Sequence, residues 1–213
     1  MLVAGLAAIV AGVVLTRDTW WLLAWSAPAA LLFGQVGFMA HEACHNQVLR
    51  TSRGNYVLSV LLFNLGLGGS RGWWAKKHNA HHAQPNRIGF DPDITGGVIA
   101  TSASEVLEAR GTARVIMRRQ AVAIWPLLCL GVLQIHLYSA AFLFDRSRRN
   151  ARWEAGLLLA HAVVYVGGLV LLAGVERGLL FALVHQMLLG AYLGAAFLPN
   201  HLGMRMLEPD ESL

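Results

Sequence analysis

Charged residues are scarce in this sequence. Asp, Glu, Lys and Arg make up 14% of the 213 residues, whereas hydrophobic residues make up 56%. Because ordinary soluble domains contain about 25% charged residues, this composition excludes a typical soluble globular protein and a disordered chain. It predicts an all-α membrane protein, in which each spanning helix needs roughly 20 apolar residues.

Cysteine is also scarce. Cys44 and Cys129 are the only two, and they lie far apart in the sequence, which argues against a disulfide-linked secreted fold. The formal net charge is +5, but the basic residues lie beside apolar segments, where they commonly orient a protein in a bilayer. No nucleic-acid partner is therefore expected.

The apolar segments are consistent with a single membrane domain over residues 1–213. Four of them are predicted to cross the membrane: 1–16, 20–40, 156–175 and 178–199. Two others are expected to be interfacial or re-entrant: 56–67 and 121–144. The first of these is too short to span, and Pro126 permits a break in the second, so that it either dips in and returns or lies in the interface.

The distribution of Lys and Arg predicts the orientation. Residues 46–120 contain ten of the 17 Lys and Arg residues, and four arginines lie within 145–152. With the predicted spans, 15 of the 17 lie on one side, and Arg17 and Arg177 on the other. By the positive-inside rule, the side rich in Lys and Arg is cytoplasmic.

Histidine is abundant by contrast, and five of the nine histidines form two tight clusters. His41 and His45 are four residues apart, and His78, His81 and His82 follow the same helical spacing. Residues three and four apart share one face of a helix, so the rings in each cluster are expected to point in one direction. Imidazoles without paired thiolates favour iron, copper, nickel or zinc and disfavour magnesium and calcium.

A single histidine at a membrane edge is more often an interfacial polar residue than a metal ligand. Two clusters with helical spacing beside one membrane surface favour metal binding instead. His136, His161 and His185 are isolated within apolar segments. They are expected to pack or to form hydrogen bonds inside the helical bundle.

The first cluster also matches His-Glu-x-x-His, the zinc metalloprotease motif in which the glutamate, here Glu42, is the general base. An intramembrane zinc protease is therefore an alternative. A site with one zinc and three protein ligands does not need the second histidine cluster, which argues against this interpretation.

Three motifs in order resemble those of the membrane fatty acid desaturases. The first is His41-x-x-x-His45, and the second is Gly72-Trp73-Trp74-x-x-Lys77-His78-x-x-His81-His82 with Asp91-Pro92-Asp93 behind it. The third, Leu198-Pro199-Asn200-His201-x-Gly203-Met204, is similar to a segment that follows the last span in bacterial members. The resemblance covers the whole chain, including the spacing of the motifs.

The resemblance implies a four-span enzyme with a cytoplasmic histidine region and a non-haem centre of two iron ions, which uses dioxygen to desaturate an acyl chain. The metal ligands that it implies are His41, His45, His78, His81, His82 and His201. Asn200 would contact the centre indirectly, and Asp91 and Asp93 would orient imidazoles. The implied partners are an acyl substrate and membrane lipids.

A separate electron carrier and its reductase are also expected. The sequence has no Gly-x-Gly-x-x-Gly fingerprint and no ligand set for an iron–sulfur cluster or a haem. The electrons would therefore come from a ferredoxin or a small haem protein.

The third histidine box of this family, His-x-x-His-His, is not found after His201. Two metal ions need more nitrogen ligands than six imidazoles supply, so the sequence predicts a chain truncated before that box and an incomplete metal site. A non-catalytic remnant is a further alternative. Hydroxylases and ketolases that act on lipids share the same boxes, so the motifs do not separate these activities from desaturation.

Overall fold

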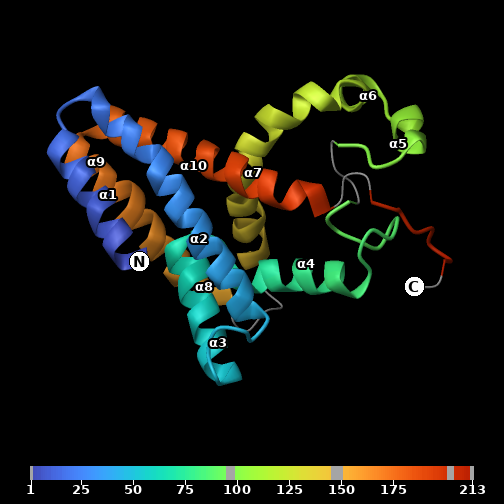
Figure 1. Cartoon of the computed structure of the whole chain (residues 1–213), viewed down its shortest axis with the longest axis horizontal. Coiled ribbons are helices and arrows are strands. Elements are labelled where there is room, and N and C mark those ends of the chain that lie inside the picture. Colours follow the sequence, from blue (N-terminus) through green and yellow to red (C-terminus); the bar gives the residue numbers. More distant parts are fainter. Residues whose placement is uncertain (1, 95–98, 145–150, 201–203, 212–213) are drawn as a thin grey trace.

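Helices make up most of the part of the chain that the structure describes. This structure is a computed structural model, and it describes residues 2–94, 99–144, 151–200 and 204–211. Within these ranges no strand occurs, and extended pairing is limited to one bridge between Arg87 and Leu207. The predicted class, an all-α membrane protein, is confirmed (Figure 1).

The helices follow the apolar segments of the sequence. The first half of the chain contains α1 (Leu2–Thr16), a 3-10 helix (Trp20–Trp25), α2 (Ser26–Cys44), α3 (Ser52–Val60), a π-helical segment (Leu61–Gly66) and α4 (Arg71–Ala83). The second half contains α5 (Ala103–Glu108), α6 (Gly111–Arg118), α7 (Gln120–Leu143), α8 (Ala151–Ala162), a π-helical segment (Val163–Gly167), α9 (Gly168–Ala173), α10 (Val175–Phe197) and a 3-10 turn (Leu198–Asn200).

Among the described residues, four helical stretches are long and apolar enough to cross a membrane, judged by length and composition. They are Trp20–Cys44, Gln120–Leu143, Arg152–Ala173 and Val175–Phe197. Three of these stretches overlap the predicted spans 20–40, 156–175 and 178–199, and whether each crosses the membrane stays a prediction. The predicted span 1–16 forms α1, whose 15 residues reach only about 22 Å, less than the hydrocarbon thickness.

The segment 121–144 lies in one continuous helix, α7, which runs through Pro126. The chain does not reverse direction at this proline, because membrane helices tolerate proline when neighbouring groups satisfy the freed carbonyl. The interfacial placement of 121–144 stays a prediction. In Figure 1, α7 passes across α10, and a Cβ atom on Gly190 would lie 2.6 Å from the carbonyl oxygen of Leu128. The two helix backbones therefore touch where they cross.

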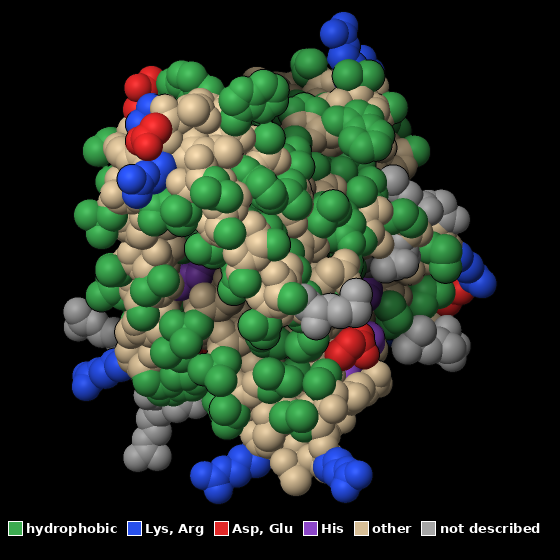
Figure 2. Space-filling view, turned by 60° about the vertical axis from the view of Figure 1, so that its left-hand side comes forward, with side chains coloured by type: hydrophobic (Ala, Val, Ile, Leu, Met, Phe, Trp, Pro, Cys, Tyr) green, Lys and Arg blue, Asp and Glu red, His purple; other side chains and the backbone are tan. Residues whose placement is uncertain are grey.

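Two small hydrophobic clusters hold the bundle together. One joins α1, the 3-10 helix Trp20–Trp25, α2, α9 and α10 through Ile9, Val13, Leu22, Ala29, Ala173 and Phe181, and the other joins α2, α7 and α10 through Ala30, Val132 and Leu189. Many other apolar side chains face outward. Leu171, for example, is 90% exposed. Figure 2 shows hydrophobic side chains across the middle of one face, with Lys and Arg toward its edges, which is the pattern of a lipid-facing surface.

The isolated histidines form hydrogen bonds inside this bundle, as expected. Nδ1 of His136 lies 2.9 Å from the carbonyl oxygen of Gly68, and Nδ1 of His161 lies 2.8 Å from that of Leu65. Nδ1 of His185 is 2.5 Å from the hydroxyl oxygen of Tyr165. Gly68 has a φ of 70°, and a Cβ atom there would lie 2.5 Å from the ring of His161. The two imidazoles therefore form hydrogen bonds with backbone carbonyl oxygens at the end of the π-helical segment, where the regular helical hydrogen bonds stop.

Candidate metal centre

The first histidine pair lies at the carboxyl end of α2. The ring centroids of His41 and His45 are 4.7 Å apart, as the four-residue spacing predicts. α2 ends at Cys44, and Asn46 follows with a φ of 61°, a left-handed conformation that asparagine adopts readily and that ends helices. The chain turns away directly after His45, so both imidazoles lie at the end of the helix.

The second cluster lies on α4. The side chain of Ser70 accepts a hydrogen bond from the backbone N–H of Trp73, which caps the helix at its first turn. This start places His78 and His82 on one face, with ring centroids 4.4 Å apart. Neither cluster is deeply buried, because both helices end near the surface of the molecule.

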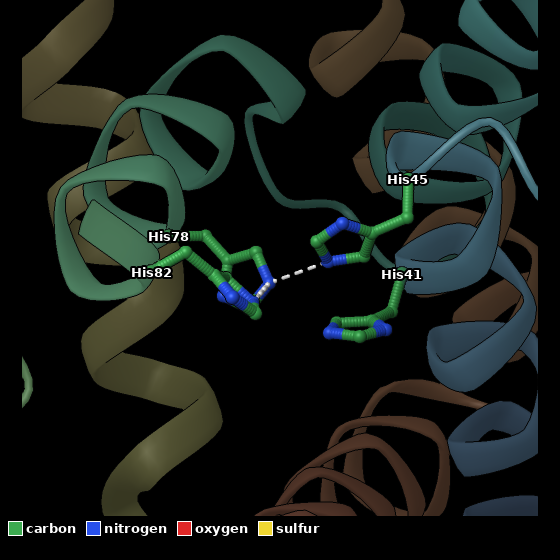
Figure 3. A group of neighbouring side chains, drawn as sticks. All are labelled: His41, His45, His78 and His82. Atoms are coloured by element: carbon green, nitrogen blue, oxygen red, sulfur yellow. Dashed lines mark hydrogen bonds between the residues drawn. The ribbon is translucent and has the colours of Figure 1, made fainter. Parts of the chain in front are cut away.

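The two clusters face each other, although 33 residues separate His45 from His78. One ring nitrogen from each of His41, His45, His78 and His82 lies within 4.8 Å of the corresponding nitrogens of the other three. Figure 3 shows the rings from α2 pointing toward the rings from α4 across a narrow gap. Four of the six predicted ligands therefore meet at one point.

The distances at this point suit a cation better than a hydrogen-bond network. Nε2 of His78 lies 2.9 Å from Nε2 of His45 and 2.9 Å from Nε2 of His82. A neutral ring nitrogen carries either one proton or one lone pair, so it forms only one good hydrogen bond with such neighbours. Three Nε2 atoms that converge in this way have the arrangement of ligands around a metal ion.

Electrostatics keep two of these rings uncharged. Burial, together with the charges that would form on His41, His82 and His45, lowers the pKa of His78 to about 3. Burial also lowers the pKa of His45 below its usual value. Both rings are therefore neutral at pH 7, and neutral imidazole is the form that binds metals.

His81 lies apart from this group of four and contacts two carboxylates. Its Nδ1 is 2.9 Å from Oδ2 of Asp91 and 3.4 Å from Oδ2 of Asp93. Asp91 is fully buried, and it also accepts hydrogen bonds from the backbone N–H groups of Asn86 and Asp93, at 2.7 and 2.8 Å. These three side chains have the spacing of a metal site. The backbone donors to Asp91, however, fit a carboxylate that orients the imidazole.

His201, the sixth predicted ligand, lies outside the described residues, as does the side chain of Asn200. The end of α10, which leads to both, is described. The ring of Phe197 lies 6.4 Å from the ring of His41, so α10 ends beside the four histidines. Residue 197 therefore lies at the same end of the bundle as His41 and His45.

Two contacts near the site were not predicted from the sequence. The indole of Trp74 stacks on His78 with a centroid distance of 4.1 Å and also packs against Phe63 at 4.7 Å. Glu154 is buried at the start of α4, although it comes from α8. A single acid at the edge of an apolar segment carries no spacing signal, so the sequence did not mark it.

The profile that describes the family "Fatty acid desaturase" matches residues 19–212. The chain belongs to the fatty acid desaturase family. It is 30% identical over 200 residues to an acyl-lipid (9-3)-desaturase of Physcomitrium patens, and the match covers 87% of this chain and 37% of that protein.

Other relatives in the desaturase family give shorter matches. An acyl-lipid (9-3)-desaturase of Borago officinalis is 29% identical over 140 residues, covering 60% of this chain and 31% of that protein. The Delta(6)-fatty-acid desaturase fat-3 of Caenorhabditis elegans is 39% identical over 74 residues, covering 35% and 17%. The matches thus cover between 17% and 37% of the length of these relatives. No solved structure matches it.

Proposed function

We propose that this chain acts in a fatty acid desaturase that removes two hydrogens from an acyl chain with dioxygen, at a centre of two iron ions. The observation that carries the proposal is the convergence of four imidazoles from α2 and α4 in a member of the fatty acid desaturase family. The names of the relatives, acyl-lipid and fatty-acid desaturases, support an acyl substrate.

The donor atoms fit iron. His41, His45, His78 and His82 supply nitrogen only, and nitrogen ligands favour iron and its neighbours in the transition series over magnesium or calcium. These four residues would hold metal, and His81 and His201 would contribute to the second ion. When bound, the iron centre supplies the oxidation of an unactivated methylene group, which no amino-acid side chain performs.

The residues around the histidines would fix the ligand geometry. Asp91 holds Nδ1 of His81, which leaves Nε2 of that ring directed away from the carboxylate. Glu42 contacts Nδ1 of His41 at 2.9 Å. In this position the Glu42 carboxylate orients a ligand, a role that differs from the general base of a zinc protease.

The electron balance of the reaction indicates which further partners the enzyme needs. Reduction of dioxygen to two waters, coupled to loss of two hydrogens from the acyl chain, takes up two further electrons and two protons. A separate carrier, a ferredoxin or a small haem protein with its reductase, would deliver the electrons. Lys76, Lys77, Arg118 and Arg119 offer basic groups for an acidic carrier, and lipid head groups compete for the last two.

The basic residues of the histidine region support a position on the cytoplasmic face. Contacts at both ends of α7 support the interfacial position of that helix. The side chain of Gln120 forms two hydrogen bonds with the backbone of Ala100, at 2.8 and 3.2 Å. Near the other end, the hydroxyl of Ser139 accepts a hydrogen bond from the N–H of Ser70 at 2.8 Å. Ala100 and Ser70 both belong to the predicted cytoplasmic region.

Metal analysis of the purified chain tests the proposal. The chain, produced in an iron-supplied host and purified in detergent, is expected to contain iron, and His45→Ala and His82→Ala are expected to lose most of it. His136→Gln is the matched control, because His136 is a bundle histidine that contacts a backbone carbonyl. It should retain the iron of the unaltered chain.

Three outcomes would contradict the proposal. One zinc ion per chain would favour the intramembrane zinc protease. Loss of a proteolytic activity in Glu42→Gln alone would also support the protease. No metal at all would favour a non-catalytic remnant. Equal iron in His45→Ala, His82→Ala and the unaltered chain would remove the ligand assignment.

A further inference from the structure

A carboxylate from α8 is buried at the start of the histidine-bearing helix α4. Glu154 is 4% exposed. Its Oε2 atom accepts hydrogen bonds from the hydroxyl of Ser70 at 2.6 Å, from Nδ2 of Asn64 at 3.2 Å and from the backbone N–H of Gly72 at 3.3 Å. One oxygen atom therefore gathers three donors that lie between the end of the preceding π-helical segment and the first turn of α4.

A further hydrogen bond ties the same segment to α7, and another joins the π-helical segment to the start of α4. The hydroxyl of Ser139 accepts from the N–H of Ser70, and Oδ1 of Asn64 accepts from the N–H of Arg71 at 3.3 Å. Asn64 and Ser70 are fully buried, and Ser139 is 1% exposed. The beginning of α4 is thus held by α7 and α8 through groups that water does not reach.

The charge of Glu154 suits this position. The first N–H groups of a helix carry a partial positive charge and lack partners within the helix, so an anion there is favourable. A buried carboxylate is costly unless several donors satisfy it, and this one has three. The opposite end of the helix, where His78 and His82 lie, carries the partial negative charge that favours a cation.

The packing leaves little freedom at this contact. A Cβ atom on Gly72 would lie 2.7 Å from Oε1 of Glu154 and 3.1 Å from the ring of Phe142. A side chain at position 72 would therefore displace the Glu154 carboxylate from this contact. His78 follows six residues later, about 9 Å along the axis, so a shift of the helix start is passed on to the ligand nitrogens.

We propose that Glu154 is a positioning residue, which fixes α4 so that His78 and His82 meet His41 and His45. The inference rests on the proposed function only in taking these four histidines as metal ligands. It assigns no contact between Glu154 and the metal or the substrate.

The test compares Glu154→Gln with Tyr165→Phe, both in the full chain in detergent. Glutamine keeps the volume of the side chain but carries no charge. The control removes the hydrogen bond between Tyr165 and His185, which does not involve α4. Two quantities are measured: the dissociation constant for Co²⁺, followed by its visible absorption, and amide hydrogen exchange of residues 71–83 in the metal-free chain.

Glu154→Gln is expected to weaken Co²⁺ binding by about 10- to 100-fold, the usual effect of removing a group that supports metal ligands. It should also speed amide exchange in the first turns of α4. Tyr165→Phe should lower the unfolding temperature without changing either quantity. If Glu154→Gln does not fold, Ser70→Ala replaces it, with a smaller shift expected in the same direction because the carboxylate remains.

Unchanged Co²⁺ affinity and unchanged exchange in Glu154→Gln, or in Ser70→Ala where that replaces it, would overturn the inference. An equal loss of affinity in Tyr165→Phe would also overturn it, because general destabilisation would then explain the effect. If the unaltered chain binds no Co²⁺, the proposed metal site fails, and the exchange of residues 71–83 alone decides whether Glu154 fixes α4.

Discussion

Nδ1 of His81 lies 2.9 Å from Oδ2 of Asp91, a carboxylate that is fully buried and that also accepts two backbone hydrogen bonds. The contact determines which tautomer His81 adopts, because Nδ1 must carry the proton that it donates to the carboxylate. The lone pair of the ring then lies on Nε2. A histidine held in this way is prepared to bind a metal through Nε2.

Asp91→Asn is expected to weaken metal binding. An amide can present its NH₂ group to His81 and leaves the two backbone donors with a weaker acceptor, so the ring loses its fixed orientation. The expected loss in Co²⁺ or Fe²⁺ affinity is about 10- to 100-fold. Equilibrium titration measures it, and Asp18→Asn, an exposed acid in the turn after α1, is the control. Equal affinity of the two variants would contradict the role of Asp91.

Gly190→Ala is expected to destabilise the bundle. The added methyl group would lie 2.6 Å from the carbonyl oxygen of Leu128, so α7 and α10 would have to move apart. Overpacking of this kind costs about 1–3 kcal/mol. Gly131→Ala, on α7 with no atom within 4 Å of the new methyl group, is the matched control. Thermal unfolding in detergent should show a lower midpoint for Gly190→Ala alone.

The metal-free chain is expected to lose stability as the pH falls below 6.5. The pKa of His78 is about 3 in the folded chain, lower than the usual value of 6.5 that applies in the unfolded chain. Between these two values the unfolded chain binds the proton and the folded chain does not, so acid favours unfolding. The free energy of unfolding should therefore fall from pH 6.5 toward pH 3.

His78→Asn removes this group and should make the pH dependence shallower. Denaturant titrations of both chains at pH 7.5 and pH 5 measure the difference. An identical pH dependence in the two chains would show that His78 titrates normally in the folded protein.

The interfacial position of α7 predicts the same accessibility at its two ends. Arg119→Cys and Phe144→Cys, in a chain whose own cysteines are replaced, should both react with a membrane-impermeant maleimide only when the cytoplasmic side is open. Glu176→Cys should react from the opposite side. Labelling of residues 119 and 144 from opposite sides would instead show that α7 crosses the bilayer.

The sequence predicted the parts of the site that depend on local geometry. His41 and His45, and His78 and His82, share a helix face because residues four apart always do so in an α-helix. The scarcity of charge predicted a helical membrane protein, because only closed backbone hydrogen bonding is tolerated in lipid. These properties follow from spacing and composition within one segment.

The tertiary structure determined which residues of different segments come into contact. It brings α2 and α4 together so that four histidine rings meet. His81 contacts Asp91 and lies apart from those four rings. The tertiary structure also places Glu154 of α8 against the start of α4. These contacts join residues 10 to 84 positions apart, and helical periodicity carries no information about them. They depend on how the helices pack as bodies, through close approaches such as the one at Gly190.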